Sequence, residues 1–293
     1  MHVLVTGASG YIGGVITEYL MKAGHTVSGL SRSDESAEKI RRLGADPVPG
    51  DLRNPAGVAA CAARADAVVH TAMAWGPDSA ALDQQMVRAT LEAMRGSGKA
   101  FVYTSGAWVM GDTKGRVAGE LTALRPPALV AWRPAVEKMV IESRNARVEG
   151  VVIRPTMVYG RGGGTLGGFV RQARTEKLVR IVGTGSNHWS FIHVDALAEL
   201  YVRAVEQAPG GELFLAADGP AFTVRIVAET VATMNEARVE LWPFDEARKQ
   251  LGAAADALVM DQRIMSTKAG RMLGWAPKWP NVLDEIRSGS YVE

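Results

Sequence analysis

The feature that most constrains the fold of this chain is a glycine-rich turn near its start, Thr6–Gly13, which reads Thr-Gly-Ala-Ser-Gly-Tyr-Ile-Gly. The turn follows an apolar strand and opens a helix, which is the context in which such a turn binds a dinucleotide. Gly7 permits the tight turn, Gly10 lets the backbone approach a pyrophosphate, and Gly13 lets the helix pack closely on the strand. The alternative is a strand–helix turn that merely favours glycine. We predict the dinucleotide site, with contacts from Gly7, Ser9, Gly10, Tyr11, Ile12 and Gly13.

The first half of the chain alternates short apolar runs with segments of helical periodicity. Apolar strands that alternate with helices predict right-handed crossovers and a parallel sheet covered on both faces. The predicted fold class is therefore α/β, a Rossmann-type doubly wound parallel sheet. The expected strands are Val3–Val5, Thr26–Leu30, Pro47–Val48, Ala67–His70, Phe101–Thr104 and Val151–Ile153. The expected helices are Tyr11–Lys22, Glu35–Leu43, Pro55–Ala62, Ala80–Met94 and Pro134–Asn145, the last beginning near Arg133.

A change of texture after Pro155 divides the chain into two regions. We predict a dinucleotide-binding domain over residues 1–155 and a smaller α/β region, mainly for substrate binding, over residues 156–293. The second region opens with a glycine-rich loop at residues 159–164, and its elements are shorter. We expect helices at Asp195–Gln207 and Arg225–Met234 and strands at Leu213–Ala216 and Val239–Leu241. Whether some of these elements return to the first sheet is left open.

The charge balance and the single cysteine narrow the class of partner. With 33 Lys and Arg against 31 Asp and Glu, the net charge of +2 is too balanced to indicate nucleic acid or an acidic membrane. Cys61 alone cannot form an internal disulfide, which fits a reducing compartment. No run approaches the ~18 apolar residues that a membrane span needs, and no signal peptide is expected. We therefore expect a cytoplasmic protein with a small-molecule partner and no nucleic acid, membrane or metal; a homodimer is left open.

The end of the second strand predicts which dinucleotide is bound. An NAD-binding protein places a carboxylate there for the ribose hydroxyls. Here Ser31, Arg32 and Ser33 occupy that end, and the Arg32 guanidinium suits a 2′-phosphate while the two hydroxyls add donors. The alternative is a solvated arginine, with Asp34 as a slightly displaced ribose ligand. We predict NADP rather than NAD.

Several segments, taken in order, resemble the short-chain dehydrogenase/reductase superfamily. The match is to its extended, atypical branch, the NAD-dependent epimerase/dehydratase and dihydroflavonol-reductase-like proteins. The matching segments are Thr6–Gly13, Gly50–Leu52, Val69–Met73, Arg154–Gly160, Phe191–Asp195 and Leu273–Pro277. The cofactor contacts that the resemblance implies are Asp51 and Leu52 at the adenine, Thr71, Ala72 and Met73 beside the inner ribose, and Pro155 and Val158 in the passage toward the substrate region.

The catalytic pair of that family, Tyr-x-x-x-Lys on the fifth helix, has no counterpart here. In the family the lysine lowers the tyrosine pKa, and the phenol then exchanges a proton with the substrate oxygen. Counting from Arg154 and Glu137 places Leu129 at the tyrosine position and Arg133 at the lysine position. Arginine can still hydrogen-bond a ribose, but leucine cannot transfer a proton.

The hydroxyl that the family carries at the end of the fifth strand is also displaced. The alignment puts Gly106 at that position and Ser105 one residue before it. A one-residue shift of register would restore Ser105. Tyr159, on the glycine-rich loop, is the first spare phenol, and Tyr103 is the second. The expected catalytic residues are Ser105, Tyr159 and Arg133.

Large side chains at the position of the family's substrate pocket indicate an apolar ligand, with ordinary packing as the alternative. They are Met73, Trp75, Trp108, Met110, Trp132, Tyr159 and Trp189. The first hypothesis is an NADP-dependent oxidoreductase acting on a small, partly apolar carbonyl-type substrate. The alternatives are a nucleotide-sugar epimerase or dehydratase, and a catalytically silent NADP-binding regulator or scaffold.

Overall fold

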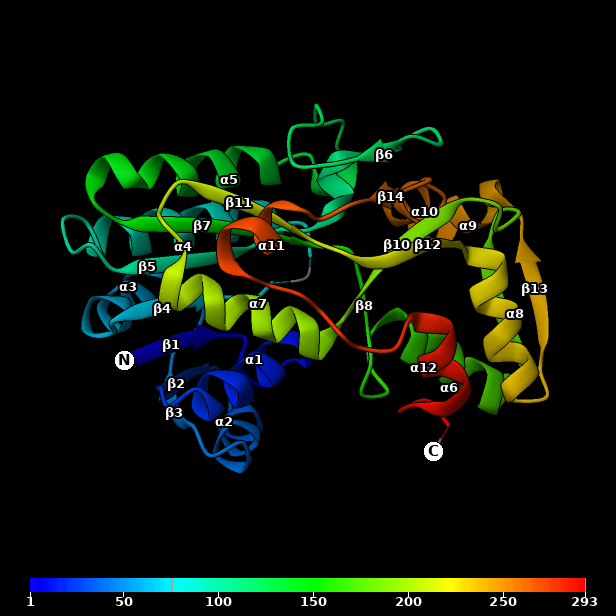
Figure 1. The fold of residues 1–293 in the computed structure, drawn as a ribbon. Coiled ribbons are helices and arrows are strands. Elements are labelled where there is room, and N and C mark those ends of the chain that lie inside the picture. Colours follow the sequence, from blue (N-terminus) through cyan, green and yellow to red (C-terminus); the bar gives the residue numbers. More distant parts are fainter. Residues whose placement is uncertain (75, 293) are drawn as a thin grey trace.

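A parallel sheet of seven strands forms the centre of the structure, a computed structural model that describes residues 1–74 and 76–292 (Figure 1). Its strand order is β11-β7-β5-β4-β1-β2-β3, and every neighbouring pair is parallel. The strands are β1 (His2–Thr6), β2 (Thr26–Ser31), β3 (Asp46–Pro49), β4 (Ala67–His70), β5 (Ala100–Thr104), β7 (Glu149–Pro155) and β11 (Glu212–Ala216). Most residues of these strands are apolar, with valine the most frequent, as expected for a sheet buried on both faces.

Helices cover both faces of this sheet (Figure 1). One face packs against α1 (Tyr11–Lys22), α2 (Asp34–Arg42), α7 (Val194–Gln207) and α11 (Lys268–Leu273). The other face packs against α3 (Pro55–Arg64), α4 (Ser79–Ala93) and α5 (Arg133–Glu142). The predicted α/β doubly wound fold is therefore confirmed.

The second half of the chain supplies a smaller assembly and also returns to the main sheet. β8 (Met157–Tyr159), β10 (His188–His193) and β12 (Asp218–Thr223) form a three-stranded sheet, and β9 (Leu178–Val182) pairs with β13 (Arg238–Trp242). Their core packs against α6 (Gly164–Glu176), α8 (Val224–Met234) and α12 (Val282–Ser288). β11, in contrast, pairs with β7, and α7 lies on the first sheet. The domain boundary at residue 155 stays a prediction.

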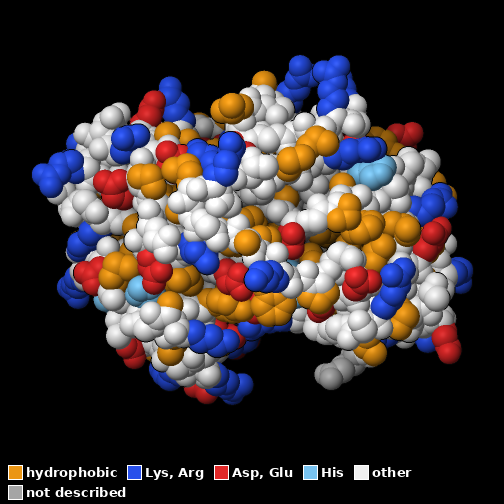
Figure 2. Space-filling model, viewed as in Figure 1, with side chains coloured by type: hydrophobic (Ala, Val, Ile, Leu, Met, Phe, Trp, Pro, Cys, Tyr) orange, Lys and Arg blue, Asp and Glu red, His pale blue; other side chains and the backbone are white. Residues whose placement is uncertain are grey.

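Short elements complete the described part of the chain. They are β6 (Val117–Ala118), β14 (Arg263–Ile264), α9 (Phe244–Leu251), α10 (Ala253–Leu258) and the 3₁₀ turns Ala107–Met110, Ala128–Val130 and Ser143–Ala146. Among the helices of the described residues, none is both long and apolar enough to cross a membrane. Figure 2 shows basic and acidic side chains interspersed over the visible face, as the small net charge leads one to expect.

Candidate functional site

The turn after β1 has the geometry of a phosphate cradle. Gly7 has a φ of +79°, and its carbonyl oxygen accepts a hydrogen bond from Gly10 N at 2.9 Å. Gly10 is the N-cap of α1 and has no side chain to accept the first amide groups of the helix. A Cβ on Gly13 would collide with the Gly7 carbonyl oxygen and lie 2.6 Å from Thr71 Oγ1. The close packing and the free helix N-terminus together fit a bound pyrophosphate.

A cavity of about 680 Å³, the dinucleotide cavity, extends from this turn along the carboxyl ends of the strands. Twelve of the predicted cofactor residues line it: Gly7, Ser9, Gly10, Tyr11, Ile12, Gly13, Arg32, Asp51, Leu52, Thr71, Ala72 and Met73. The sequence-based set lacks Leu30, Ser36, Gly50, Arg53 and Ala74, which also line it. Arg53 could have been predicted from the sequence, because it is a basic residue that directly follows the predicted contacts Asp51 and Leu52.

Two hydroxyls expected to bind the cofactor are used inside the protein instead. Ser31 is 7% exposed, and its hydroxyl donates to the Val48 carbonyl at 3.4 Å. Ser33 is the N-cap of α2, where its Oγ accepts from Ser36 N at 3.2 Å. Neither lines the dinucleotide cavity, and neither does Asp34, which begins α2. Of the groups predicted at this end, Arg32 is the one that lines the cavity.

A second, mostly apolar cavity of about 210 Å³, the Ser105 cavity, lies beside the first and shares Met73 with it. Pro155, which was expected beside the cofactor, lines this cavity, whereas Val158 packs against the core of the main sheet. The lining residues are Met73, Ser105, Gly106, Ala107, Trp108, Leu129, Val130, Arg133, Pro155, Thr156, Met157 and Gln262. The residues counted to the family's catalytic positions, Leu129 and Arg133, therefore lie at one site with Ser105.

Ser105 presents an unsatisfied hydroxyl to this cavity. Its backbone N–H donates to the Ile153 carbonyl at 2.8 Å, which fixes the residue just beyond β5 and against β7. The side chain is 7% exposed, and Oγ has no hydrogen-bond partner within the described part of the chain. A buried hydroxyl without a partner costs free energy, so a ligand oxygen in the cavity would stabilise it.

Arg133 brings a positive charge to the same cavity. One guanidinium nitrogen donates to the Thr104 carbonyl at 2.9 Å and another to Met73 Sδ at 3.2 Å. The guanidinium also lies over the Trp132 ring, 4.9 Å from its centroid. All of these contacts are with neutral groups. They orient the charge without neutralising it.

The position of Tyr159 argues against its predicted role as proton donor. Its side chain is 1% exposed within the core of the second region, and its hydroxyl donates to the Pro280 carbonyl at 2.6 Å. Burial raises the pKa of the phenol above its usual value, which makes it a weaker acid. Tyr159 does not line the Ser105 cavity.

Tyr103 belongs to a buried polar network below the site. Its hydroxyl donates to Asp83 at 2.7 Å, and the other Asp83 oxygen lies 2.9 Å from His70 Nε2. Thr6 Oγ1 lies 2.6 Å from His70 Nδ1, so both nitrogens of that ring are satisfied. Burial raises the pKa of Tyr103 as well. Neither tyrosine is placed to transfer a proton to a ligand in the Ser105 cavity.

The large side chains expected at the substrate pocket separate into several environments. Met73 and Trp108 line the Ser105 cavity. Met110 is buried behind it, where its sulfur accepts from Arg154 at 3.3 Å. Trp132 stacks on Arg133, while Trp189 packs in the core of the second region. Trp75 lies outside the described residues.

The glycine-rich loop after β8 is held against the dinucleotide turn. The Tyr11 hydroxyl donates to the Gly160 carbonyl at 2.8 Å, and Tyr291 donates to the Gly163 carbonyl at 2.8 Å. Arg161 on this loop pairs with Asp195 at 2.6 Å. Tyr11 therefore connects the first helix to the second region as well as lining the dinucleotide cavity.

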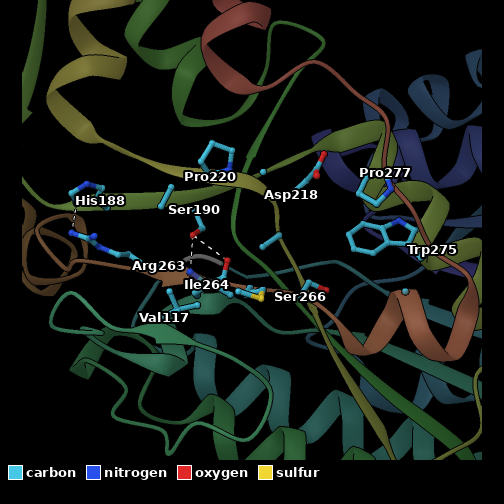
Figure 3. Close-up of a pocket in the computed structure, with 15 residues that line it drawn as sticks. Val117, His188, Ser190, Asp218, Pro220, Arg263, Ile264, Ser266, Trp275 and Pro277 are labelled. Atoms are coloured by element: carbon cyan, nitrogen blue, oxygen red, sulfur yellow. Dashed lines mark hydrogen bonds between the residues drawn. The ribbon is translucent and has the colours of Figure 1, made fainter.

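A third cavity, of about 470 Å³, lies apart from the predicted site residues (Figure 3). Its polar side chains hold β10 and β14 together: Ser190 Oγ accepts from Ile264 N at 2.8 Å, and an Arg263 nitrogen lies 3.1 Å from His188 Nδ1. Burial raises the pKa of Asp218 on the same wall. The cavity shares no lining residue with the other two. Its polar contacts are those of a structural junction.

Comparison with known proteins places the chain in a family. The model of the NAD dependent epimerase/dehydratase family matches residues 3–217. A 2-alkyl-3-oxoalkanoate reductase of Stenotrophomonas maltophilia is 27% identical over 277 residues, covering 88% of this chain and 83% of that protein. A 4-hydroxy-2-methyl-3-oxo-4-farnesyl-3,4-dihydroquinoline-1-oxide ketoreductase of Stigmatella aurantiaca is 28% identical over 271 residues, covering 85% and 78%.

Solved structures agree with this placement at the level of the fold. The structure of a UDP-glucuronic acid 4-epimerase from Bacillus cereus in complex with NAD superposes with a TM-score of 0.83 at 18% identity, covering 100% of this chain and 98% of that chain. The glycine turn, the strand order and the family match lead to one assignment. This chain belongs to the NAD dependent epimerase/dehydratase family, whose members are NAD(P)-dependent enzymes.

Proposed function

We propose that this enzyme is an NADP-dependent oxidoreductase that acts on a small, partly apolar carbonyl-type substrate in the Ser105 cavity. The observation that carries the proposal is the adjacency of the two cavities. The dinucleotide cavity and the Ser105 cavity share Met73, and the second holds a buried hydroxyl without a partner. When bound, the nicotinamide cofactor supplies or accepts the hydride. The protein supplies orientation and electrostatics.

The residues of this chain divide the work by position. The free amides at the N-terminus of α1 hold the pyrophosphate. Asp51, in the dinucleotide cavity, binds the adenosine. Arg133 lines the Ser105 cavity and contacts Met73, the residue that both cavities share. The Ser105 hydroxyl donates a hydrogen bond to the substrate oxygen. Apolar walls that include Trp108 and Met157 lower the polarity around that contact, which strengthens it.

The preference for NADP rests on the charges near the end of β2. Arg32 and Arg53 line the dinucleotide cavity and offer two guanidinium groups to a 2′-phosphate. The Ser36 hydroxyl lines it too, but it donates to the Ser33 carbonyl at 2.8 Å. Asp34, the alternative ribose ligand, does not line the cavity. The epimerase of known structure contains NAD, so NAD is the competing cofactor to be measured.

The similarity to two reductases of keto compounds supports a carbonyl-type substrate. The likeness to an epimerase structure keeps nucleotide-sugar chemistry as the alternative. A mostly apolar cavity of about 210 Å³ favours a compact apolar group over a sugar nucleotide, because a cavity of about 150 Å³ already admits benzene. A cytoplasmic location and a homodimer are further proposals, the first resting on the lone Cys61.

Cofactor binding and turnover test the proposal together. Protein fluorescence titrated with NADPH and with NADH should give tighter binding for NADPH. A panel of small aldehydes, ketones and enones is then scored for NADPH oxidation. Oxidation with at least one acceptor is expected. Binding of NADPH without oxidation by any acceptor would favour the catalytically silent regulator, and turnover of a UDP-sugar without net oxidation would favour the epimerase.

A further inference from the structure

The Ser105 cavity holds two groups that can bind a negative oxygen, the Ser105 hydroxyl and the Arg133 guanidinium. Its described lining residues include no general acid. Of the described residues that line it, none carries a phenol, imidazole, thiol or carboxyl. Leucine stands at the position counted to the family's tyrosine, and Tyr103 and Tyr159 donate their hydroxyl protons elsewhere, to Asp83 and to the Pro280 carbonyl. An arginine guanidinium does not release its proton in proteins, so Arg133 supplies a positive charge and no acid. The cavity can therefore stabilise a negative oxygen but cannot protonate it.

This combination selects between two kinds of carbonyl acceptor. Hydride addition to the carbonyl carbon of a simple ketone leaves an alkoxide, whose conjugate acid is about as weak an acid as water. Such an oxygen needs a proton as it forms, and general acid help is typically worth about 10²–10⁴-fold in rate. An enolate oxygen is delocalised like a phenolate, whose conjugate acid has a pKa of about 10. A positive charge and one hydrogen bond are enough to hold it.

Resting on the oxidoreductase function proposed above, we infer that the substrate is an α,β-unsaturated carbonyl compound reduced at its C=C bond. Hydride adds to the β carbon and forms a C–H bond, the C=C π bond breaks, and the electron pair moves through the α carbon onto the carbonyl oxygen. The cofactor leaves this step oxidised to NADP⁺. A water molecule then gives a proton to the α carbon and leaves as hydroxide, while the enolate electron pair forms the new C–H bond and the C=O bond is restored in the saturated carbonyl product. In this step Ser105 and Arg133 hold the enolate oxygen.

The two side chains are built for that task by their surroundings. The Ser105 hydroxyl is buried and has no partner among the described residues, so its proton is free for the enolate oxygen. The Arg133 guanidinium is oriented by the Thr104 carbonyl, by Met73 Sδ and by the Trp132 ring, none of which cancels its charge. Burial in a mostly apolar cavity strengthens both interactions.

A chromophoric phenol tests the oxyanion site without any turnover. Bound 4-nitrophenol mimics the enolate, and its absorbance distinguishes phenol from phenolate. We expect the protein alone to bind it as the phenolate, with its pKa lowered by at least one unit from that in buffer, which is a tenfold change in the ionisation constant. Arg133→Met should abolish the shift, and Arg133→Lys should retain part of it. Ser105→Ala should weaken binding by about two- to tenfold.

The result that overturns the oxyanion site is binding as neutral phenol, or a pKa shift that persists in Arg133→Met. Circular dichroism melting establishes that each variant is folded. If Arg133→Met does not fold, Ser105→Ala decides in its place, and unchanged affinity for 4-nitrophenolate overturns the assignment.

A matched pair of acceptors tests the substrate class. 2-Cyclohexenone and cyclohexanone differ only in the conjugated double bond. NADPH oxidation with 2-cyclohexenone should yield cyclohexanone, and cyclohexanone itself should react at least 100-fold more slowly. Equal rates on the two would overturn this inference and leave the proposed oxidoreductase function standing. If no acceptor of the wider panel supports NADPH oxidation, the proposed oxidoreductase function is wrong. The nitrophenol titration would then still decide whether Arg133 and Ser105 hold an oxyanion.

Discussion

At the residue scale, Arg32 is the side chain whose chemistry most directly separates the two nicotinamide dinucleotides. It lines the dinucleotide cavity at the end of β2, where a carboxylate would repel a 2′-phosphate. A charge-assisted contact of this kind is worth on the order of 1.5–3 kcal/mol, or roughly a ten- to hundredfold preference. We expect Arg32→Ala to remove that preference for NADPH while leaving NADH affinity nearly unchanged.

Fluorescence titration of both cofactors measures this effect. Arg41→Ala provides the matched control. Arg41 is an exposed residue of α2 that does not line the cavity, and its guanidinium pairs with Glu38 at 3.5 Å. A wild-type protein with equal affinity for both cofactors would contradict the prediction, as would a preference that survives in Arg32→Ala.

At the element scale, the junction of β1 and α1 depends on two glycines for different reasons. A Cβ on Gly10 would meet only the Gly7 carbonyl oxygen, at 3.2 Å, whereas one on Gly13 would collide with that oxygen and crowd Thr71. Gly10→Val should therefore fold and lose at least tenfold in NADPH affinity, because its side chain enters the pyrophosphate site. Gly13→Ala should also lose about 1–3 kcal/mol of stability through overpacking.

Thermal melting and NADPH titration of the two variants separate these effects. If Gly10→Val melts like the wild type and keeps its full affinity for NADPH, Gly10 does not lie at the cofactor site. Native-like melting in Gly13→Ala would show that the turn can widen without cost.

A second prediction at this scale concerns the contact between α5 and β7. Arg154 on β7 pairs with Glu137 on α5 through two hydrogen bonds, at 2.9 and 2.6 Å, and the two side chains are 4% and 3% exposed. Removing one partner leaves a buried charge unpaired, which typically costs about 3–5 kcal/mol. Arg154→Met should lower the free energy of unfolding in urea by that amount.

The double variant Arg154→Met with Glu137→Leu should lose less stability than Arg154→Met alone, because it leaves no buried charge. A loss in the double variant as large as in the single one would show that packing, and not the ion pair, fixes α5. Since Arg133 begins α5, the single variant should also weaken binding of 4-nitrophenol.

At the scale of the whole molecule, His193 couples stability to pH. His193 ends β10 and is the N-cap of α7. Its ring stacks on Trp279 with centroids 4.6 Å apart and accepts a hydrogen bond from Asp195 N at 3.2 Å. Burial lowers the pKa of His193, an effect that Arg161 reinforces and that Asp195 and Glu285 only partly oppose. The folded protein therefore holds this ring neutral at pH values where the unfolded chain, with a pKa of about 6.5, already binds a proton.

The unfolded state then binds more protons than the folded state below pH ~6.5. Above that pH, the contribution of His193 to the free energy of unfolding should not change with pH. It should fall below it by up to ~1.4 kcal/mol per pH unit, until the pH reaches the lowered pKa of the folded state. Urea unfolding between pH 8 and 5.5 measures the slope, and His193→Gln should reduce it. An identical slope in the variant would show that other groups carry the pH dependence.

Local sequence patterns were enough to predict the dinucleotide-binding region. The turn at Thr6–Gly13 and the bounds of α1 and β4 were predictable, because glycine placement and hydrophobic period act over a few residues. The return of β11 to the main sheet was not predictable, since strand pairing depends on contacts between distant segments. The same limit applies to Tyr159. Its place on a glycine-rich loop suggested a phenol without a partner, because the sequence does not show the distant residue that it contacts.

Only the tertiary structure decided which polar groups remain available to a ligand. Tyr159 donates to Pro280, 121 residues away, and Ser31 donates to Val48 on the neighbouring strand. Ser105, by contrast, ends with a buried hydroxyl that no other described residue satisfies. The sequence determined which side chains can donate or accept. Folding determined which donors are already satisfied, because a hydrogen bond depends on the positions of two atoms that the chain brings together only when folded.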